Sequence, residues 1–386
     1  MDGSDRLTLR VVDTLADVPA AAWDACAGAN PFVSYAFLQV LEESGSATDE
    51  TGWLPQHLLL EDDCGQMIGA TPLYLKNHSY GEYVFDHGWA AAYERAGGRY
   101  YPKLQVAVPF TPVPGPRLLL RPDARPGAMR LLVAGLVQVA KRSEVSSLHV
   151  TFPTATECDA LVDAGFLRRV GRQFHWENLG YRSFDDFLAA LNARKRKQIK
   201  RERRDANEAV TIEMLSGDDV KAHHWDAFFR FYTSTSDRKW GSPYLTREFF
   251  SLLGQRMAEK VLLVMAKHDG RYVAGALNLI GSDTLYGRNW GCIGHFPFLH
   301  FEACYYRAIE FAIARGLKRV EAGAQGEHKI LRGYLPQPTY SAHWIRDPGF
   351  RGAVEDFLRR EAVAVENEME ELEEGLSPFR REGDGR

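Results

Sequence analysis

The sequence predicts an α/β protein made of two similar domains and a C-terminal helix. Two observations favour this fold. First, 386 residues are enough for two hydrophobic cores. Second, residues 57–75 and 261–280 share one pattern: an apolar strand, a polar turn with glycine, and a second strand with Gly69 or Gly275 at the matching place. We interpret this repeat as a domain duplication.

The elements expected after each hairpin follow the same order. The first half reads as strand, helix, strand and short helix at residues 104–110, 128–142, 146–152 and 155–166. The second half repeats this order at residues 283–292, 299–316, 318–323 and from 328 onward. We therefore predict an N-terminal domain, a C-terminal domain, and a helix with a tail, at residues 1–170, 171–350 and 351–386.

Composition restricts the class of protein. Apolar residues make up 45% of the chain and charged residues 25%, with a formal net charge of −4, so the chain as a whole does not resemble a nucleic-acid-binding protein. The five cysteines are scattered, which predicts neither a disulfide framework nor a metal or redox motif. We see no secretory leader and no membrane-spanning stretch. We expect a cytoplasmic protein that can contact a membrane from the inner face.

Six segments carry a family resemblance. They are NPFVSYAFL (30–38), GRYYPKLQVAVPFTPVPGPRLL (98–119), RKRKQIKRERR (194–204), YGRNWGC (286–292), LHFEACYY (299–306) and EAGAQGEHKILRGYLP (321–336). With the order of elements, they resemble the FemAB-like (peptidoglycan biosynthesis/recognition) family of predicted N-acyltransferases in the GNAT superfamily. The resemblance implies two tandem GNAT-like domains and transfer of an acyl or aminoacyl group from an activated (thio)ester to an amine, in cell-envelope or amino-lipid metabolism.

One departure concerns the phosphate loop of GNAT proteins, which has the pattern Arg/Gln-x-x-Gly-x-Gly/Ala. Neither half contains it. The nearest equivalent is VPGPR (113–117); its prolines 114 and 116, and Pro112 just before it, remove backbone donors that a pyrophosphate would use. The co-substrate is therefore open between an acyl-CoA, an acyl-carrier protein and an aminoacyl-tRNA, and we expect no permanently bound cofactor.

The stretch 321–334 holds the predicted catalytic groups. An attacking amine must be neutral, so a base has to remove its proton, and the candidates are Glu321, Glu327 and His328. Lys329 and Arg332 can hold a carboxylate or phosphate of either substrate. The alternative is a solvated loop with a structural ion pair.

Two neighbouring segments add candidates. His300 and Glu302 open the helix expected to face this loop, although Glu302 can also stabilise a helix N-terminus unaided. Tyr286, Arg288 and Trp290 alternate along one strand, so we expect them on one face, lining a substrate pocket or forming a cation–π layer.

The first domain offers a second group. Tyr101 and Lys103 precede a strand, and Asp86, His87 and Trp89 lie upstream; together they can line a cleft or pack as a surface loop. The histidine spacing matches no metal motif, so we expect no metal site.

A basic block occupies residues 194–204, with eight basic residues and one acid in eleven. We expect it to continue a helix begun at Ser183, and to bind tRNA or an anionic membrane surface. The residues selected for this role are Lys195, Arg196, Lys200 and Arg203. The alternative is a solvated helix face.

Two other functions stay open. One is fatty-acyl transfer to a long-chain amino alcohol, as in ceramide-type synthesis. The other is a recognition module that keeps the fold without catalysis. No GxSxG motif is present, so a covalent serine route is not expected.

Overall fold

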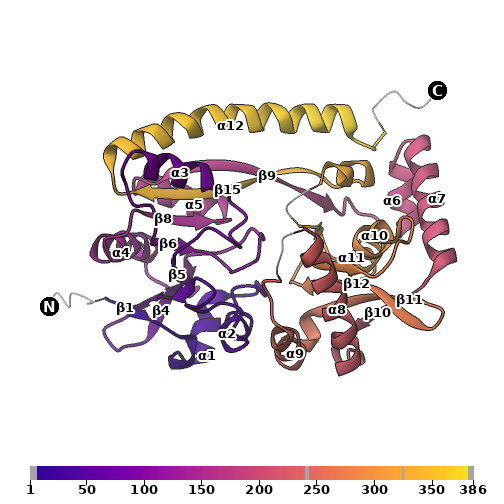
Figure 1. Ribbon diagram of the computed structural model, residues 1–386, viewed down its shortest axis with the longest axis horizontal. Helices are drawn as coiled ribbons and strands as arrows, with labels where there is room; N and C mark the ends of the chain where they lie inside the picture. Colours follow the sequence, from indigo (N-terminus) through magenta and orange to yellow (C-terminus); the bar gives the residue numbers. More distant parts are fainter. Residues whose placement is uncertain (1–6, 240–242, 324–325, 381–386) are drawn as a thin grey trace. The chain divides into compact units, whose positions relative to one another are not determined.

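The computed structural model describes residues 7–239, 243–323 and 326–380 (Figure 1). The chain forms two compact units, one of Met1–Gly171 with Pro338–Glu366 and one of Arg172–Gln337 with Asn367–Arg386. The first boundary lies beside the predicted one at residue 170. Residues 338–350, expected in the second domain, belong to the first unit. No helix in the described ranges is long and apolar enough to cross a membrane.

The first unit contains two sheets. Strands β1 (Thr8–Val12), β3 (His57–Glu61), β4 (Met67–Thr71) and β7 (Leu119–Leu120) form one, in the order β1-β3-β4-β7. The other has the order β15-β8-β6-β5-β2 and consists of β15 (Leu335–Ile345, paired here through Ser341–Ile345), β8 (Ser147–Thr151), β6 (Lys103–Val106), β5 (Leu73–Lys76) and β2 (Trp53–Pro55). Its helices are α1 (Ala20–Ala27), α2 (Tyr35–Glu43), α3 (His87–Arg95), α4 (Ala128–Arg142), α5 (Ala155–Asp163) and the start of α12 (Pro348–Leu376).

The second unit is built on one sheet in the order β10-β11-β12-β13-β14-β9. These strands are β10 (Thr211–Ser216), β11 (Val261–His268), β12 (Arg271–Ile280), β13 (Thr284–Cys292), β14 (Arg319–Glu321) and the end of β9 (Leu167–Glu177). The main helices are α6 (Phe184–Ala190), α7 (Ala193–Ala209), α8 (Ala222–Lys239), α9 (Arg247–Arg256), α10 (Leu299–Phe301) and α11 (Arg307–Ala314). All neighbouring pairs are antiparallel except β13 and β14, which are parallel.

Both segments of the sequence repeat form antiparallel hairpins, β3–β4 and β11–β12. Gly69 pairs with Leu60 and Gly275 with Met265. A Cβ atom on Gly69 would lie 2.9 Å from a Leu120 methyl carbon, and one on Gly275 would lie 2.8 Å from the Met265 sulfur. Each glycine therefore permits a close approach of a neighbouring side chain to the strand.

Helix α8 packs against β12 and β13 in the second unit (Figure 1). Gly275 and Gly291 are cross-strand partners on these strands. Cβ atoms at these positions would approach Phe228 to 2.9 Å and the carbonyl oxygen of Phe231 to 2.1 Å, both on α8. The helix can lie this close because the sheet has no side chains there.

Two predicted helices are interrupted. The helix expected to run on from Ser183 is two helices, because Asn192 has extended backbone angles and its side chain accepts the Lys195 N–H, which starts α7 anew. The helix expected over residues 299–316 contains a π-helical turn, η4 (Glu302–Tyr306), between α10 and α11. Such turns change the direction in which the following side chains point, and they are frequent at functional sites.

Candidate functional site

The central feature of the second unit is the place where β13 and β14 part. The two strands pair over Thr284–Tyr286 and Arg319–Glu321, and β13 then continues to Cys292 while β14 ends. Beyond Tyr286, β13 has no strand partner on the β14 side in the described part of the chain. Gly287 follows at once, and a Cβ there would lie 3.2 Å from the Glu321 carbonyl oxygen. The backbones of β13 and β14 are therefore still close together at Gly287, and they separate directly after it.

A cavity of about 410 Å³ lies at this separation. Strands β12 and β13 line one side, the turn around η4 another, and the segment after β14 the third. The lining residues that carry polar or aromatic groups are Asn278, Arg288, Asn289, Trp290, His300, Cys304, Tyr305, His328 and Lys329. A volume in this range suits a small ligand group. Five residues predicted for the site (Arg288, Trp290, His300, His328 and Lys329) are thus lining residues.

His328 lies among aromatic rings. Its Nε2 is 2.9 Å from the Tyr305 hydroxyl, and the two ring centroids are 5.7 Å apart. The His300 ring lies 6.0 Å away and in turn packs against Trp290 at 5.3 Å. The hydrogen bond to Tyr305 engages the Nε2 atom of His328 and thereby fixes the orientation of the imidazole ring.

Lys329 is a buried amine on the cavity wall, with a side chain that is 2% exposed. Its Nζ donates to the Gly323 carbonyl oxygen at 2.8 Å. Burial lowers the pKa of Lys329 to about 7. With this pKa the amine can exchange a proton near neutral pH, and its predicted role in holding an anionic group stays a prediction.

Glu321 ends β14 and is 5% exposed. Burial raises the pKa of this carboxyl to about 8, against the opposing charges of Arg319 and Arg288. Its Oε2 has no hydrogen-bond partner among the described residues. Glu321 adjoins the point of separation but does not line the cavity, in contrast to His328.

Arg332 lies away from the cavity, in a buried ion pair. Its Nη2 donates to both carboxylate oxygens of Glu202 at 3.0 Å, and Nη1 donates to the His328 carbonyl oxygen at 2.8 Å. The guanidinium stacks on Phe301, 3.4 Å from the ring centroid. These contacts hold the backbone at His328 in place, and the predicted substrate contact of Arg332 stays a prediction.

Glu302 and Arg203, predicted for catalysis and anion binding, pair with each other. Arg203 donates to both oxygens of the fully buried Glu302 at 3.0 Å and to Glu310 at 2.7 Å. Arg307 approaches Glu302 to 2.8 Å. The carboxylate therefore has two cationic partners and anchors the π-helical turn to α7.

The alternation expected for Tyr286, Arg288 and Trp290 is interrupted by a β-bulge. Leu277 pairs with Asn289 and Asn278 with Gly287, which leaves Arg288 as the extra residue. Arg288 and Trp290 line the cavity, whereas Tyr286 does not. The bulge places four consecutive residues of β13, 287–290, along the cavity, which strict alternation would not allow.

Lys103, predicted to bind substrate, is fully buried in the first unit. Its Nζ donates to Ser79 and Glu82 at 2.7 Å and to Asp86 at 2.5 Å. Burial opposes its charge, but these two carboxylates outweigh burial and raise the pKa of Lys103. Tyr101 is half-buried and its hydroxyl is 2.8 Å from the Ser79 hydroxyl. Both side chains form a polar network within this unit.

The basic helix α7 presents most of its charge to solvent. Lys200 is exposed, Lys195 and Arg196 are half-buried, and burial lowers the pKa of Lys195. The remaining exposed cations of the block are Arg194, Lys197, Arg201 and Arg204.

Sequence reasoning missed two residues that shape the site. Tyr305 was visible within LHFEACYY, but its bond to His328 requires the π-helical turn. Glu202 is the one acid of the basic block, and this isolation was the available signal: it is 2% exposed and binds Arg332 and the Tyr306 hydroxyl. Of the stretch 321–334, residues 324 and 325 lie outside the described residues.

Solved structures with a similar fold are known. The crystal structure of FemX matches with a TM-score of 0.55 and 11% identity, over 90% of this chain and 100% of FemX. The structure of L-PGS from Bacillus licheniformis matches with a TM-score of 0.51 and 10% identity, over 83% of this chain and 94% of that one. A tandem GNAT protein from the clavulanic acid biosynthesis pathway matches at 0.48, with 13% identity over 89% of this chain and 99% of its own. Identities this low bear on the fold alone. None of the curated proteins matches this sequence.

The two-unit mixed α/β fold is similar to that of FemX, and the tandem GNAT-like fold class predicted from the sequence is confirmed. The family model for peptidoglycan biosynthesis/recognition matches residues 14–381. The chain belongs to the FemAB-like family.

Proposed function

We propose that the protein is an N-acyltransferase that moves an acyl or aminoacyl group from an activated (thio)ester to an amine of a cell-envelope precursor. The observation that carries the proposal is the cavity at the parted ends of β13 and β14, where His328 and Lys329 lie together. Lys329, with its pKa lowered to about 7, suits the proton transfer near neutral pH that amide formation from an amine requires.

The edge of β13 beyond Tyr286, where β14 has ended, offers a place for the acyl donor to bind. N–H groups of β13 beyond Tyr286 lack a strand partner on the β14 side in the described residues. A donor carbonyl laid along this edge would accept hydrogen bonds there as a strand does, and negative charge developing on its oxygen would be stabilised by the same donors.

The proposed reaction needs no covalent enzyme intermediate. The amine nitrogen attacks the donor carbonyl carbon, and His328, oriented by Tyr305, takes the amine proton. The C–S or C–O bond of the donor then breaks, and Lys329, with its pKa lowered to about 7, gives a proton to the leaving thiolate or alkoxide. Proton exchange between the two groups through the cavity restores the starting state.

The exposed cations of α7 support an anionic donor or acceptor. A one-sided positive surface attracts phosphate groups, whether of a coenzyme A or of a tRNA. The absence of a GNAT phosphate loop from the sequence favours recognition of the anion through such a surface.

The test is product formation from a donor panel. Purified protein is incubated with an acyl-CoA, an acyl-carrier protein or an aminoacyl-tRNA and a pool of amino-bearing envelope precursors, and the amide is identified by mass spectrometry. We expect one donor to give an amide with stoichiometric release of its thiol or deacylated tRNA. We also expect the cavity-filling variant Ala322→Phe to abolish it, since Ala322 is a lining residue. An amide yield unaffected by Ala322→Phe, at an unchanged melting temperature, would place the chemistry elsewhere. Saturable binding without any amide would favour the recognition module.

A further inference from the structure

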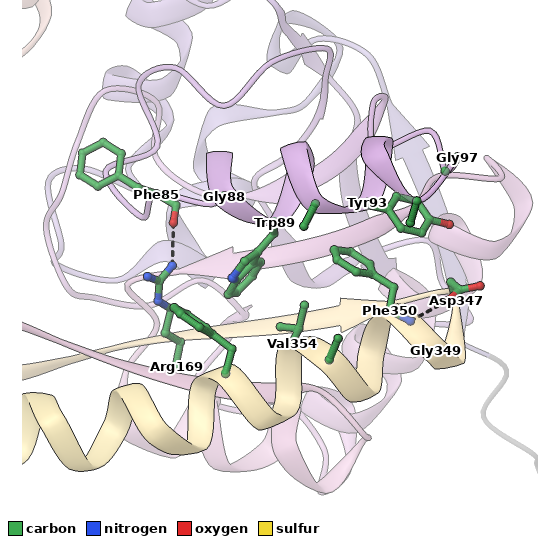
Figure 2. Close-up of a pocket in the computed structure, with 15 residues that line it drawn as sticks. Phe85, Gly88, Trp89, Tyr93, Gly97, Arg169, Asp347, Gly349, Phe350 and Val354 are labelled. Atoms are coloured by element: carbon green, nitrogen blue, oxygen red, sulfur yellow. Dashed lines mark hydrogen bonds between the residues drawn. The ribbon is translucent and has the colours of Figure 1, made fainter.

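A second and larger cavity lies within the first unit, between α3 and the first turns of α12. Its volume is about 850 Å³. Figure 2 shows Trp89 and Tyr93 descending from α3 and Phe350 and Val354 rising from α12 toward them. The lining is thus mainly apolar and aromatic, although the cavity is open to solvent at one side. None of its residues belongs to the site of the second unit.

The cavity exists because small residues alternate with large ones. Tyr93 of α3 and Phe350 of α12 stack with their ring centroids 4.4 Å apart, which sets the spacing of the two helices, and Trp89 packs edge-on against His343 of β15 at 4.9 Å. Ala92 and Ala353 line the space between these contacts and leave it unfilled. Two large apolar side chains on the rim, Phe85 and Phe357, are 53% and 40% exposed. Exposed apolar side chains around an apolar cavity are typical of a site that takes an apolar ligand.

The charged groups lie at opposite ends of the cavity (Figure 2). Arg169, at one end, donates to both oxygens of Glu361 at 2.7 Å and to the Phe85 carbonyl oxygen at 2.8 Å, so its charge is already compensated. Asp347, at the other end, accepts the Phe350 N–H at 2.7 Å and has no cationic partner among the residues that the structure describes. The lining is therefore negative at the Asp347 end.

We propose that this cavity binds a single unbranched alkyl chain with an amine head group, the chain lying between α3 and α12 and the ammonium beside Asp347. The apolar lining, the volume and a carboxylate without a cationic side-chain partner among the described residues together favour this class over a fatty acid, whose carboxylate would face Asp347. Binding here requires neither a donor nor the chemistry of the second unit, so it can be tested separately.

The experiment is calorimetric titration with octylamine, decylamine and dodecylamine below their micelle concentrations, with decanoate and decanol as comparisons. We expect saturable one-to-one binding that tightens about fourfold for each added methylene, the increment of burying one methylene group. Decylamine should bind more tightly than decanol, and decanol more tightly than decanoate.

Variants locate the site. Ala92→Phe and Ala353→Phe fill the cavity from its two walls, and we expect each to weaken dodecylamine binding at least tenfold. Ala91→Phe, an exposed neighbour on α3 outside the lining, should leave it unchanged. Asp347→Asn keeps a side chain that can cap α12 but removes the charge, so it should weaken the amines several-fold and leave decanol unaffected.

Three results would overturn the proposal. One is the absence of saturable binding by any alkyl probe. Another is binding that the two cavity-filling variants do not weaken. A third is tighter binding of decanoate than of decylamine. If no probe binds, and if the protein self-associates in sedimentation experiments and Ala353→Phe abolishes this self-association, the cavity is instead part of an interface between two copies of this chain.

Discussion

The buried ion pair between Arg332 and Glu202 decides whether Arg332 is a structural or a substrate-binding residue. The side chains are 4% and 2% exposed, and two hydrogen bonds of 3.0 Å join them. Arg332→Met removes the cation and keeps most of the apolar stem. It leaves the Glu202 carboxylate with the Gln198 amide and the Tyr306 hydroxyl as partners.

Loss of one partner of a buried pair costs about 3–5 kcal/mol, because an uncompensated charge remains in the interior. A domain of this size loses about 2–4 °C of melting temperature per kcal/mol, so we expect the transition of the second unit to fall by about 6–20 °C. The double variant Arg332→Met/Glu202→Gln should recover part of this loss, since the unpaired charge is gone.

The measurement is thermal and urea unfolding of the three proteins, followed by tryptophan fluorescence. Arg204→Met is the matched control: Arg204 lies on the same helix as Glu202, and its pairs with Asp205 and Glu208 are exposed, so the change should cost less than about 1 kcal/mol. If Arg332→Met costs no more than Arg204→Met, the pair is not a buried one. Arg332 would then again be a candidate for binding substrate.

Three further predictions follow from the described geometry. Because the folded-state pKa of Lys329 is depressed from 10.5 to about 7, the unfolded chain binds the extra proton between these values. The unfolding free energy should therefore rise with pH between about 7 and 10.5, by at most about 1.4 kcal/mol per pH unit. Lys329→Met should remove this contribution to the pH dependence of the unfolding free energy. Identical pH dependences in the two proteins would contradict the burial of the amine. The combined changes Lys197→Gln, Lys200→Gln, Arg201→Gln and Arg204→Gln neutralise exposed cations of α7 and should weaken tRNA binding in filter assays and reduce its salt dependence. Unchanged binding at low salt would mean that this helix face is solvated and binds no tRNA. Gly291→Ala should destabilise by several kcal/mol because its Cβ would lie 2.1 Å from the Phe231 carbonyl oxygen, while Gly352→Ala, on α12 with nothing within 4 Å, should stabilise by about 0.5–1 kcal/mol; equal unfolding midpoints would refute the close packing of α8.

Local patterns predicted much of the fold. The helix at residues 128–142 was predicted from its apolar content and appears with these bounds as α4. The two hairpins were predicted from strand-length runs around polar turns, and both form. The tandem architecture was predicted from the repeated hairpin and the order of the elements after it, and the family segments added the expectation of GNAT-like domains.

The candidate site was predicted less completely, because its details depend on contacts between distant residues. The bulge at Arg288 is a property of the pairing between β12 and β13, not of β13 alone. Arg332 meets a carboxylate 130 positions away, so its sequence neighbours gave no indication of burial. Lys103 was expected to line a cleft or to pack in a surface loop; in the structure it is buried with three polar partners.

Of the cavity of the first unit, the sequence indicated only Trp89, as part of a possible cleft wall. Most of its lining residues come from α3 and α12, more than 250 positions apart, and no sequence motif joins them. It is the absence of large side chains at Ala92 and Ala353 that creates the space, and sequence patterns do not indicate unfilled volume.

The most direct test of the central claim is the rate of amide formation by His328→Gln, measured with the donor and amine that the panel identifies. If His328 takes the amine proton, the rate should fall about a hundredfold or more while the melting temperature stays within a few degrees of the wild type. His223→Gln, an exposed histidine of α8 outside the cavity, is the matched control and should retain full activity. Equal rates for wild type and His328→Gln would contradict the proposed role of the cavity residues in acyl transfer.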